Sequence, residues 1–189
     1  MCPPWVFQFR VAQALLGLSY RLLASQFTPL LQKLESAVQS WMGKHLSYAG
    51  RVELICSVLY GMVHFWLSIF PIPDLVIKQI ICICRTFLWT GDVLKSKSAL
   101  VAWHTVCLPK NEGGLGLFHI KACNKSFIAK QLWNIHLKTD SIWIKWIHHY
   151  YLPNLSIWDA SPQRTSSPLW KSIISLQDQL LADCGGRHQ

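Results

Sequence analysis

The residues of this sequence best suited to chemistry are basic and aromatic side chains that lie near one another along the chain. Trp89 and Trp103 flank Lys95 and Lys97. Aromatic rings stack on bases while lysine and arginine neutralise phosphates, a combination typical of nucleic-acid-binding surfaces. We therefore predict a nucleic-acid-binding surface made of the following residues: Arg51, Lys95, Lys97, Lys110, Lys121, Lys125, Trp89 and Trp103.

The acidic residues do not form a catalytic pattern. Enzymes that use two metal ions need several carboxylates that converge on one point. The nine Asp and Glu residues are scattered singly along the chain, and none forms an Asp-Asp or Asp-x-Asp cluster. The sequence also has no G-x-S-x-G nucleophile elbow, and for His104 and Cys107 a structural role is favoured over a Cys–His pair. We predict no catalytic residue and no enzyme activity.

Metal and cofactor sites are not expected either. Cys82 and Cys84 lie two positions apart in a helical pattern, so they point to different faces and cannot chelate one ion together. The glycine run at 113–116 lacks the setting of a dinucleotide site or a P-loop. Seven cysteines without paired C-x-x-C spacing favour reduced thiols in an intracellular protein, in the nucleus or the cytoplasm.

Composition indicates a folded, basic protein. Hydrophobic residues make up 51% of the 189 residues and charged residues 14%, which excludes a disordered chain. The net charge of +9 needs counterions or an anionic partner, either nucleic acid or an acidic membrane surface. A basic surface that serves only solubility is also compatible with this charge.

The hydrophobic periodicity predicts helices. Thr28 is expected to cap the first, and the second is expected over 51–70 after a break at 47–50. The third should span 74–89 and end before Gly91. A basic loop containing Gly and Pro follows, with room for short β segments around 99–117. Caps at Asn124, at Thr139–Asp140 and at Ser167 should begin the later helices.

The fold class is therefore all-α, an irregular helical bundle. We expect a poorly specified lead-in at 1–27, a bundle at 28–91, a basic connection at 92–123, a C-terminal helical segment at 124–182 and a tail without structure at 183–189. Five tryptophans are expected to anchor the helical core: Trp41, Trp133, Trp143, Trp146 and Trp170.

One apolar stretch could be a membrane-spanning helix instead of part of a soluble protein. Residues 54–73 contain no Asp, Glu, Lys or Arg, which is about the length a membrane span requires. Pro71 and Pro73 would end a helix there, so we expect packing rather than a span and no membrane partner. The first residues lack the basic region of a signal peptide, so none is expected.

Several blocks resemble a known family when they are read in order. They are LSYAGRVELICSVL at 46–59, FPIP at 70–73, FLWTG at 87–91, VAW at 101–103, VCLPK at 106–110, EGGLG at 112–116, NK at 124–125, LWN at 132–134, WIKW at 143–146 and SPLWK at 167–171. This series resembles the region after the palm in plant LINE-type (non-LTR) retrotransposon reverse transcriptases. Residues 1–14 do not match it.

The resemblance implies a thumb-like region between the palm and the C-terminal zinc-binding domain. In that family the catalytic aspartates lie upstream, in a motif that this sequence lacks. The implied partner is an RNA/DNA primer-template, together with other parts of the parent polyprotein. We expect a non-catalytic piece of an RNA-directed DNA polymerase that binds nucleic acid. Two alternatives stay open: a small membrane protein that spans once through 54–70, and a non-functional product of a transposon-derived pseudogene.

Overall fold

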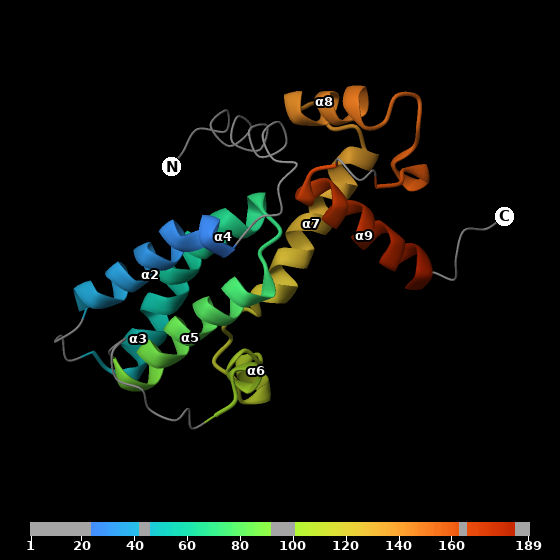
Figure 1. The fold of residues 1–189 in the computed structure, drawn as a ribbon. Coiled ribbons are helices and arrows are strands. Elements are labelled where there is room, and N and C mark those ends of the chain that lie inside the picture. Colours follow the sequence, from blue (N-terminus) through green and yellow to red (C-terminus); the bar gives the residue numbers. More distant parts are fainter. Residues whose placement is uncertain (1–23, 42–45, 92–100, 163–165, 184–189) are drawn as a thin grey trace. The chain divides into compact units, whose positions relative to one another are not determined.

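The computed structural model describes residues 24–41, 46–91, 101–162 and 166–183 (Figure 1). These residues form helices and loops, with no β-strand among them, which confirms the predicted all-α class. They divide into two compact units. The N-terminal unit contains residues 24–68 and 72–123, and the C-terminal unit contains residues 69–71 and 124–183.

The N-terminal unit begins with a 3₁₀ turn, η1 (Ala24–Phe27), that leads into α2 (Thr28–Trp41). Leu30, Leu34 and Val38 recur every four residues and are buried, so one face of α2 packs and the other meets solvent. Thr28 was predicted to precede the helix, but it is its first residue. Phe27 is itself buried, and the chain is already turning when it reaches Thr28.

Three consecutive segments form the long apolar helix of this unit. They are α3 (Tyr48–Leu54), the π-helical segment η2 (Ile55–Leu59) and α4 (Tyr60–Ile69). The helix begins three residues before the predicted position, because the Ser47 hydroxyl accepts a hydrogen bond from the Gly50 N–H and caps it. In η2 the Tyr60 N–H bonds to the Ile55 carbonyl, five residues back, which widens the turn.

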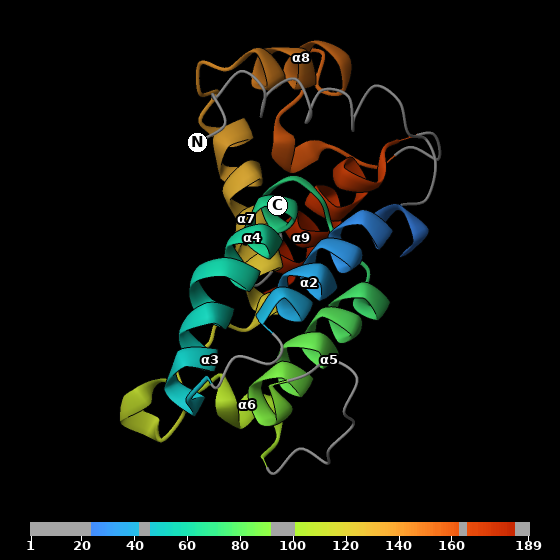
Figure 2. The same ribbon diagram turned by 90° about the vertical axis from the view of Figure 1, so that its left-hand side faces the viewer.

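Helix α5 (Asp74–Thr90) packs against α2 and α3, and both views show it alongside α2 (Figures 1 and 2). The predicted stripe is buried at Ile77, Ile80, Cys84, Phe87 and Leu88. Burying each such aliphatic or aromatic side chain contributes roughly 1.5–3 kcal/mol. The predicted stop is confirmed at Gly91, which is left-handed (φ 70°) and donates its N–H to the Phe87 carbonyl.

The connection after α5 is helical turn and loop in its described part, residues 101–119. It holds α6 (Trp103–Val106) and the 3₁₀ turn η3 (Lys110–Glu112). The predicted β segments do not form at 101–117, although the Leu115 N–H reaches the Val106 carbonyl at 3.0 Å. Glycines fold this segment back tightly on itself instead of extending it. A Cβ at Gly114 would collide with the Leu108 backbone.

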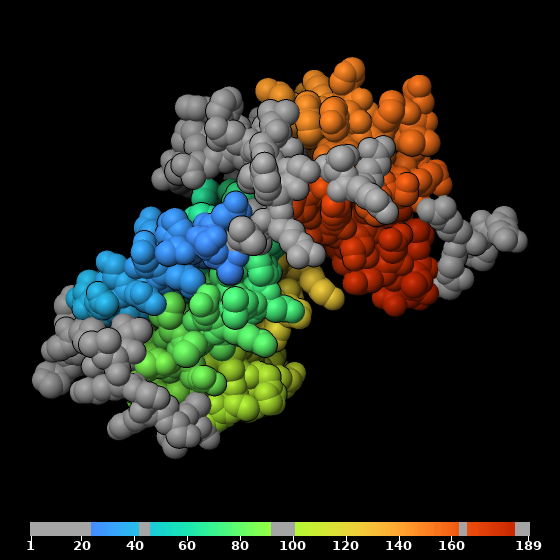
Figure 3. Space-filling model, in the orientation of Figure 1, coloured from blue at the N-terminus to red at the C-terminus, as the bar shows by residue number. Residues whose placement is uncertain are grey.

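The C-terminal unit is built from α7 (Ile120–His136), α8 (Ile142–Tyr150), the 3₁₀ turn η4 (Ile157–Asp159) and α9 (Pro168–Asp183). The first residues of α7 belong to the N-terminal unit. The three longer helices share one apolar core, which includes Leu132, Ile147, Trp170 and Ile173. In Figure 3 the red surface of α9 lies directly against the orange residues around α8 and η4.

Two of the predicted caps in this unit are wrong and one is confirmed. Asn124 lies inside α7, where its side-chain amide donates to the Phe70 carbonyl at 2.9 Å instead of capping a helix. Ser141, not the Thr139–Asp140 pair, occupies the N-cap of α8. Ser167 does cap α9, because its hydroxyl accepts the Trp170 N–H at 3.2 Å.

The predicted tryptophan anchors divide into three groups. Trp143 and Trp170 are buried and Trp41 and Trp146 are partly buried, as expected of core residues. Trp133 is 56% exposed, so the prediction is wrong there. The buried stripe of α7 runs through Ile128, Leu132 and Ile135, and Trp133 follows Leu132 by one residue, about 100° around the helix.

Candidate nucleic-acid interface

Arg51, a predicted phosphate ligand, is engaged inside the N-terminal unit. Its Nη1 donates to the Leu88 carbonyl at 3.2 Å, in the last turn of α5. An uncapped carbonyl at a helix C-terminus favours a nearby cation, because the cation donates a hydrogen bond to it and interacts favourably with the negative end of the helix dipole. The guanidinium also lies against Gly91. Arg51 therefore stabilises the end of α5, and only part of its donor capacity is left for another ligand.

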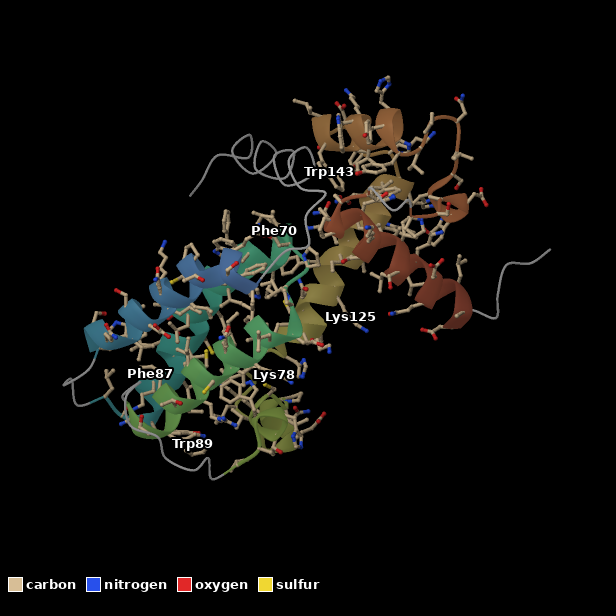
Figure 4. All side chains as sticks on the ribbon, in the orientation of Figure 1. Phe70, Lys78, Phe87, Trp89, Lys125 and Trp143 are labelled. Carbon is tan, nitrogen blue, oxygen red and sulfur yellow. The ribbon has the colours of Figure 1, made fainter. Side chains whose placement is uncertain are left out.

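The two predicted aromatic residues differ in exposure. Trp103 is only 9% exposed and belongs to the core of the N-terminal unit, so its ring is not a surface platform. Trp89 is partly buried at the end of α5, where Figure 4 shows it, with its ring 5.6 Å from that of Tyr48. Its indole N–H is buried without a hydrogen-bond partner. Of the pair, Trp89 has the more accessible ring.

Lys121 is exposed, but it is already paired with a carboxylate. Its Nζ lies 2.9 Å from one oxygen of Asp74 and 3.1 Å from the other. The hydrogen bond from Lys121 and its charge hold the pKa of Asp74 below its usual value, and Lys78 lowers it further. An exposed pair of this kind is weak and exchanges readily, so Lys121 can meet a phosphate only by leaving Asp74.

Lys110 is exposed at the start of η3, in the tight segment after α6. Its side chain lies beside Gly116 and near the thiol of Cys56. Burial and Glu53 raise the pKa of Cys56, and Lys110 opposes this with its positive charge. Lys95 and Lys97 lie outside the described residues.

Lys125 is the predicted residue with the most favourable surroundings. Figure 4 shows it projecting from α7. It lines a hollow of about 290 Å³ in the C-terminal unit together with Lys171, Ser172, Ser175 and Gln179 of α9. Two lysines and several polar side chains thus face one groove, which has no acidic residue in its lining. Such a groove suits a phosphate backbone. Lys171 was not among the predicted residues, although SPLWK was one of the family blocks.

A second group in this unit was missed at the sequence level. The exposed ring of Trp133 lies 5.5 Å from His136, and His136 lies 5.5 Å from Trp158. Trp158 donates its indole N–H to Nδ1 of His136 at 3.0 Å, which holds the group together. The position of Trp133 beside the stripe of α7, instead of on it, was the signal that could have identified it.

Charge is unevenly distributed between the described and the remaining residues. Eleven of the eighteen basic and eight of the nine acidic residues lie in the described ranges, which therefore carry a net charge of +3. The other ranges carry +6, including Lys95 and Lys97. Long-range attraction to an anion thus comes largely from the latter ranges, and the groove contributes local contacts.

No group of three or more His, Cys, Asp or Glu side chains among the described residues could hold a metal ion. The cysteines at 56, 82, 84, 107 and 123 are free. Cys82 is exposed and Cys84 is buried, which confirms that the two point to different faces of α5.

Two proteins of Arabidopsis thaliana are similar to this chain. One is named "Putative ribonuclease H protein" and is 33% identical over 165 residues, which cover 85% of this chain and 26% of that protein. The other, an uncharacterized mitochondrial protein, is 28% identical over 109 residues, covering 57% of this chain and 71% of that protein.

This chain therefore spans about a quarter of the length of the first relative. No family model matches the sequence, and no solved structure matches it. What these findings show is that the chain is an all-α protein related in sequence to two proteins of a plant.

Proposed function

We propose that this chain is a non-catalytic, transposon-derived segment of a LINE-type reverse transcriptase and binds nucleic acid. The ordered family blocks support the origin, and so does the similarity to a protein named for ribonuclease H over 85% of the chain. The proposed partner is an RNA/DNA primer-template. Other parts of a parent polyprotein would supply the chemistry.

The observation that carries the binding proposal is the groove between Lys125 of α7 and Lys171 of α9. Both helices are fixed by the core beneath them, where Ile128, Leu132, Ile173 and Ile174 are buried. A rigid pair of helices holds the two cations in place, so binding costs little conformational entropy of the backbone and side chains. Ser172 already donates its hydroxyl to the Pro168 carbonyl at 3.0 Å, so Ser175 is the serine of the groove that can add a hydrogen bond to a phosphate oxygen.

Anisotropy titrations of the full chain with a labelled RNA/DNA primer-template, at several salt concentrations, test this proposal. Replacing both Lys125 and Lys171 with Gln should reduce the slope of log affinity against log salt by up to about 1.8, since each phosphate contact contributes about 0.9. At 0.1 M salt this corresponds to a loss of up to about 60-fold.

The matched control replaces Lys33 and Lys78 with Gln, because both are exposed on helices of the N-terminal unit and the charge change is the same. This control variant should keep most of the slope of log affinity against log salt. Equal losses in the two double variants would show that net charge alone matters and that the groove does not. Absence of binding by the unaltered chain at low salt would reject the proposed function itself.

A second candidate is a membrane span. The helix over Tyr48–Ile69 has 22 residues and is long and apolar enough to cross a bilayer. Of its most apolar 18-residue stretch, 33% is buried in the structure. The proposed span, residues 54–70, falls almost entirely inside it. Carbonate extraction of membranes from expressing cells distinguishes the candidates: a spanning chain stays in the pellet, and release into the supernatant excludes it.

A further inference from the structure

The C-terminal unit has a pocket of about 790 Å³ beside the turn that joins α7 to α8. Its floor is apolar and includes Ile144, Leu152 and Ile157, which also belong to the core. Its rim carries Lys138, Lys145 and His136. Five apolar and eight polar or charged residues line the pocket, so a small organic group can make both kinds of contact there.

Two unusual backbone positions lie in this pocket. Lys138 (φ 50°) and Asn154 (φ 61°) are the non-glycine residues with positive φ in the described ranges, and both line it. Lys138 ends α7 in a Schellman turn, in which its N–H bonds to Ile135 and the Thr139 N–H bonds to Asn134, both at 3.2 Å. Glycine usually occupies this place. Strained side-chain-bearing residues tend to occur at functional sites.

Two histidines, His136 and His148, line the pocket, and each makes one hydrogen bond within the unit. His136 accepts the Trp158 N–H at Nδ1, so the proton of its neutral ring is on Nε2 and can be donated to a ligand. His148 is bonded through Nε2 to the Ile135 carbonyl at 3.0 Å and must donate there, which leaves its Nδ1 as an acceptor. Both histidines line the pocket, together with the buried side chains of its apolar floor.

The charge at the rim favours an anion near Lys138. Lys145 is paired with Asp140 at 2.7 Å, and both side chains are mostly exposed. This pair neutralises the one acidic side chain of the lining. Lys138 has no ion-pair partner within the described residues, so its charge is free to meet a phosphate.

We propose that this pocket binds one unpaired nucleotide of a single strand, with its base on the apolar floor and its phosphate at Lys138. A neighbouring base would stack on the exposed ring of Trp133, which contacts His136 at the rim. A duplex keeps its bases stacked and paired, so it offers no free base face to either surface. The proposal rests on the proposed nucleic-acid binding and names the form that this unit prefers, a single strand.

Anisotropy titrations of the full chain test this, with a fluorescein-labelled single strand of about 12 nucleotides, within the usual site size of single-strand binders, and with the blunt duplex of the same sequence. Replacing Trp133 with Ala should weaken single-strand binding by roughly 5- to 150-fold, the range for loss of one stacked base. Duplex binding should change less than about two-fold. Tyr150→Ala is the matched control, because Tyr150 is 64% exposed on α8 and does not line the pocket.

Lys138→Gly separates binding from folding. Glycine suits the left-handed backbone, so the variant should unfold at the same or a higher temperature while it binds the single strand more weakly than the charge-matched Lys33→Gln. Asp140→Asn should strengthen binding, because it breaks the ion pair and leaves the charge of Lys145 available to the nucleotide.

If Trp133→Ala and Lys138→Gly bind the single strand as their controls do, the pocket proposal is overturned and the groove proposal stands. Equal binding of single strand and duplex by the unaltered chain would also overturn it. If the unaltered chain binds neither oligonucleotide at low salt, the proposed function fails as well.

Discussion

A side chain at Gly91 should destabilise the N-terminal unit, because Gly91 lies against the guanidinium of Arg51. An alanine at Gly91 would keep the left-handed backbone (φ 70°), which costs roughly 1–2 kcal/mol for a residue with a side chain. Its Cβ would lie 3.0 Å from Cζ of Arg51 and 3.1 Å from Nη2, closer than such contacts normally are. The guanidinium must therefore move, which weakens its hydrogen bond to the Leu88 carbonyl.

Loss of that hydrogen bond adds about 0.5–1.5 kcal/mol. The free energy of unfolding of Gly91→Ala should therefore fall by about 1.5–3.5 kcal/mol. For a chain of this size the melting temperature should fall by about 3–14 °C, since each kcal/mol corresponds to about 2–4 °C. Thermal and urea unfolding followed by far-UV circular dichroism measure both quantities.

Gly61→Ala is the matched control. Gly61 lies in α4, and a Cβ there would meet nothing within 4 Å. Alanine is a better helix former than glycine, so this variant should gain about 0.5–1 kcal/mol. The same substitution should thus have opposite signs at the two positions.

A double-mutant cycle separates the two parts of the penalty at Gly91. With Arg51 changed to Ala, the alanine at 91 no longer displaces a guanidinium, and only the backbone part of about 1–2 kcal/mol should remain. The reasoning is refuted if Gly91→Ala is as stable as the unaltered chain, or if the Arg51→Ala background leaves the whole penalty in place.

Two further predictions concern buried groups. Iodoacetamide should modify Cys82 and Cys56 in the native protein and spare Cys84, because Cys84 is fully buried and burial raises the pKa of its thiol to about 12. Peptide mass spectrometry measures the modification of each cysteine. Equal modification of Cys82 and Cys84 would contradict the burial of the α5 stripe. Ser167→Ala should lower the free energy of unfolding by about 1 kcal/mol in urea titrations, because the Trp170 N–H loses its cap. Equal stability of Ser167→Ala and the unaltered chain would exclude the cap.

Local patterns were sufficient to identify most helices from the sequence. The apolar spacing in α2 and α5 and the glycine at 91 each follow from chain-local physics, and the structure agrees at each. The start of the second helix was placed late because a serine followed by tyrosine, alanine and glycine resembles a break. Only the hydrogen bond from Gly50 to Ser47 shows that it is a cap.

The candidate site was less predictable, because it depends on contacts between distant residues. Nothing local shows that Arg51 bonds to a carbonyl 37 positions away, or that Lys121 pairs with Asp74. Asn124 resembles a cap in the sequence, yet its amide satisfies the Phe70 carbonyl. The exposure of Trp133 follows from helix geometry, whereas the burial of Trp103 depends on how the segment after α5 folds back.

The π-helical segment at Ile55–Leu59 gives the long apolar helix one residue more than a regular α-helix of the same rise would hold. Ile55, Leu59, Val63 and Leu67 are all buried at a strict interval of four, a spacing that would drift around a regular helix by about 40° per step. The wide turn absorbs part of this drift. Deletion of one residue here would restore the α-helical hydrogen-bond pattern locally. The inward faces of the two flanking helical segments would keep their orientation. The chain can therefore change its length at this segment without changing its packing.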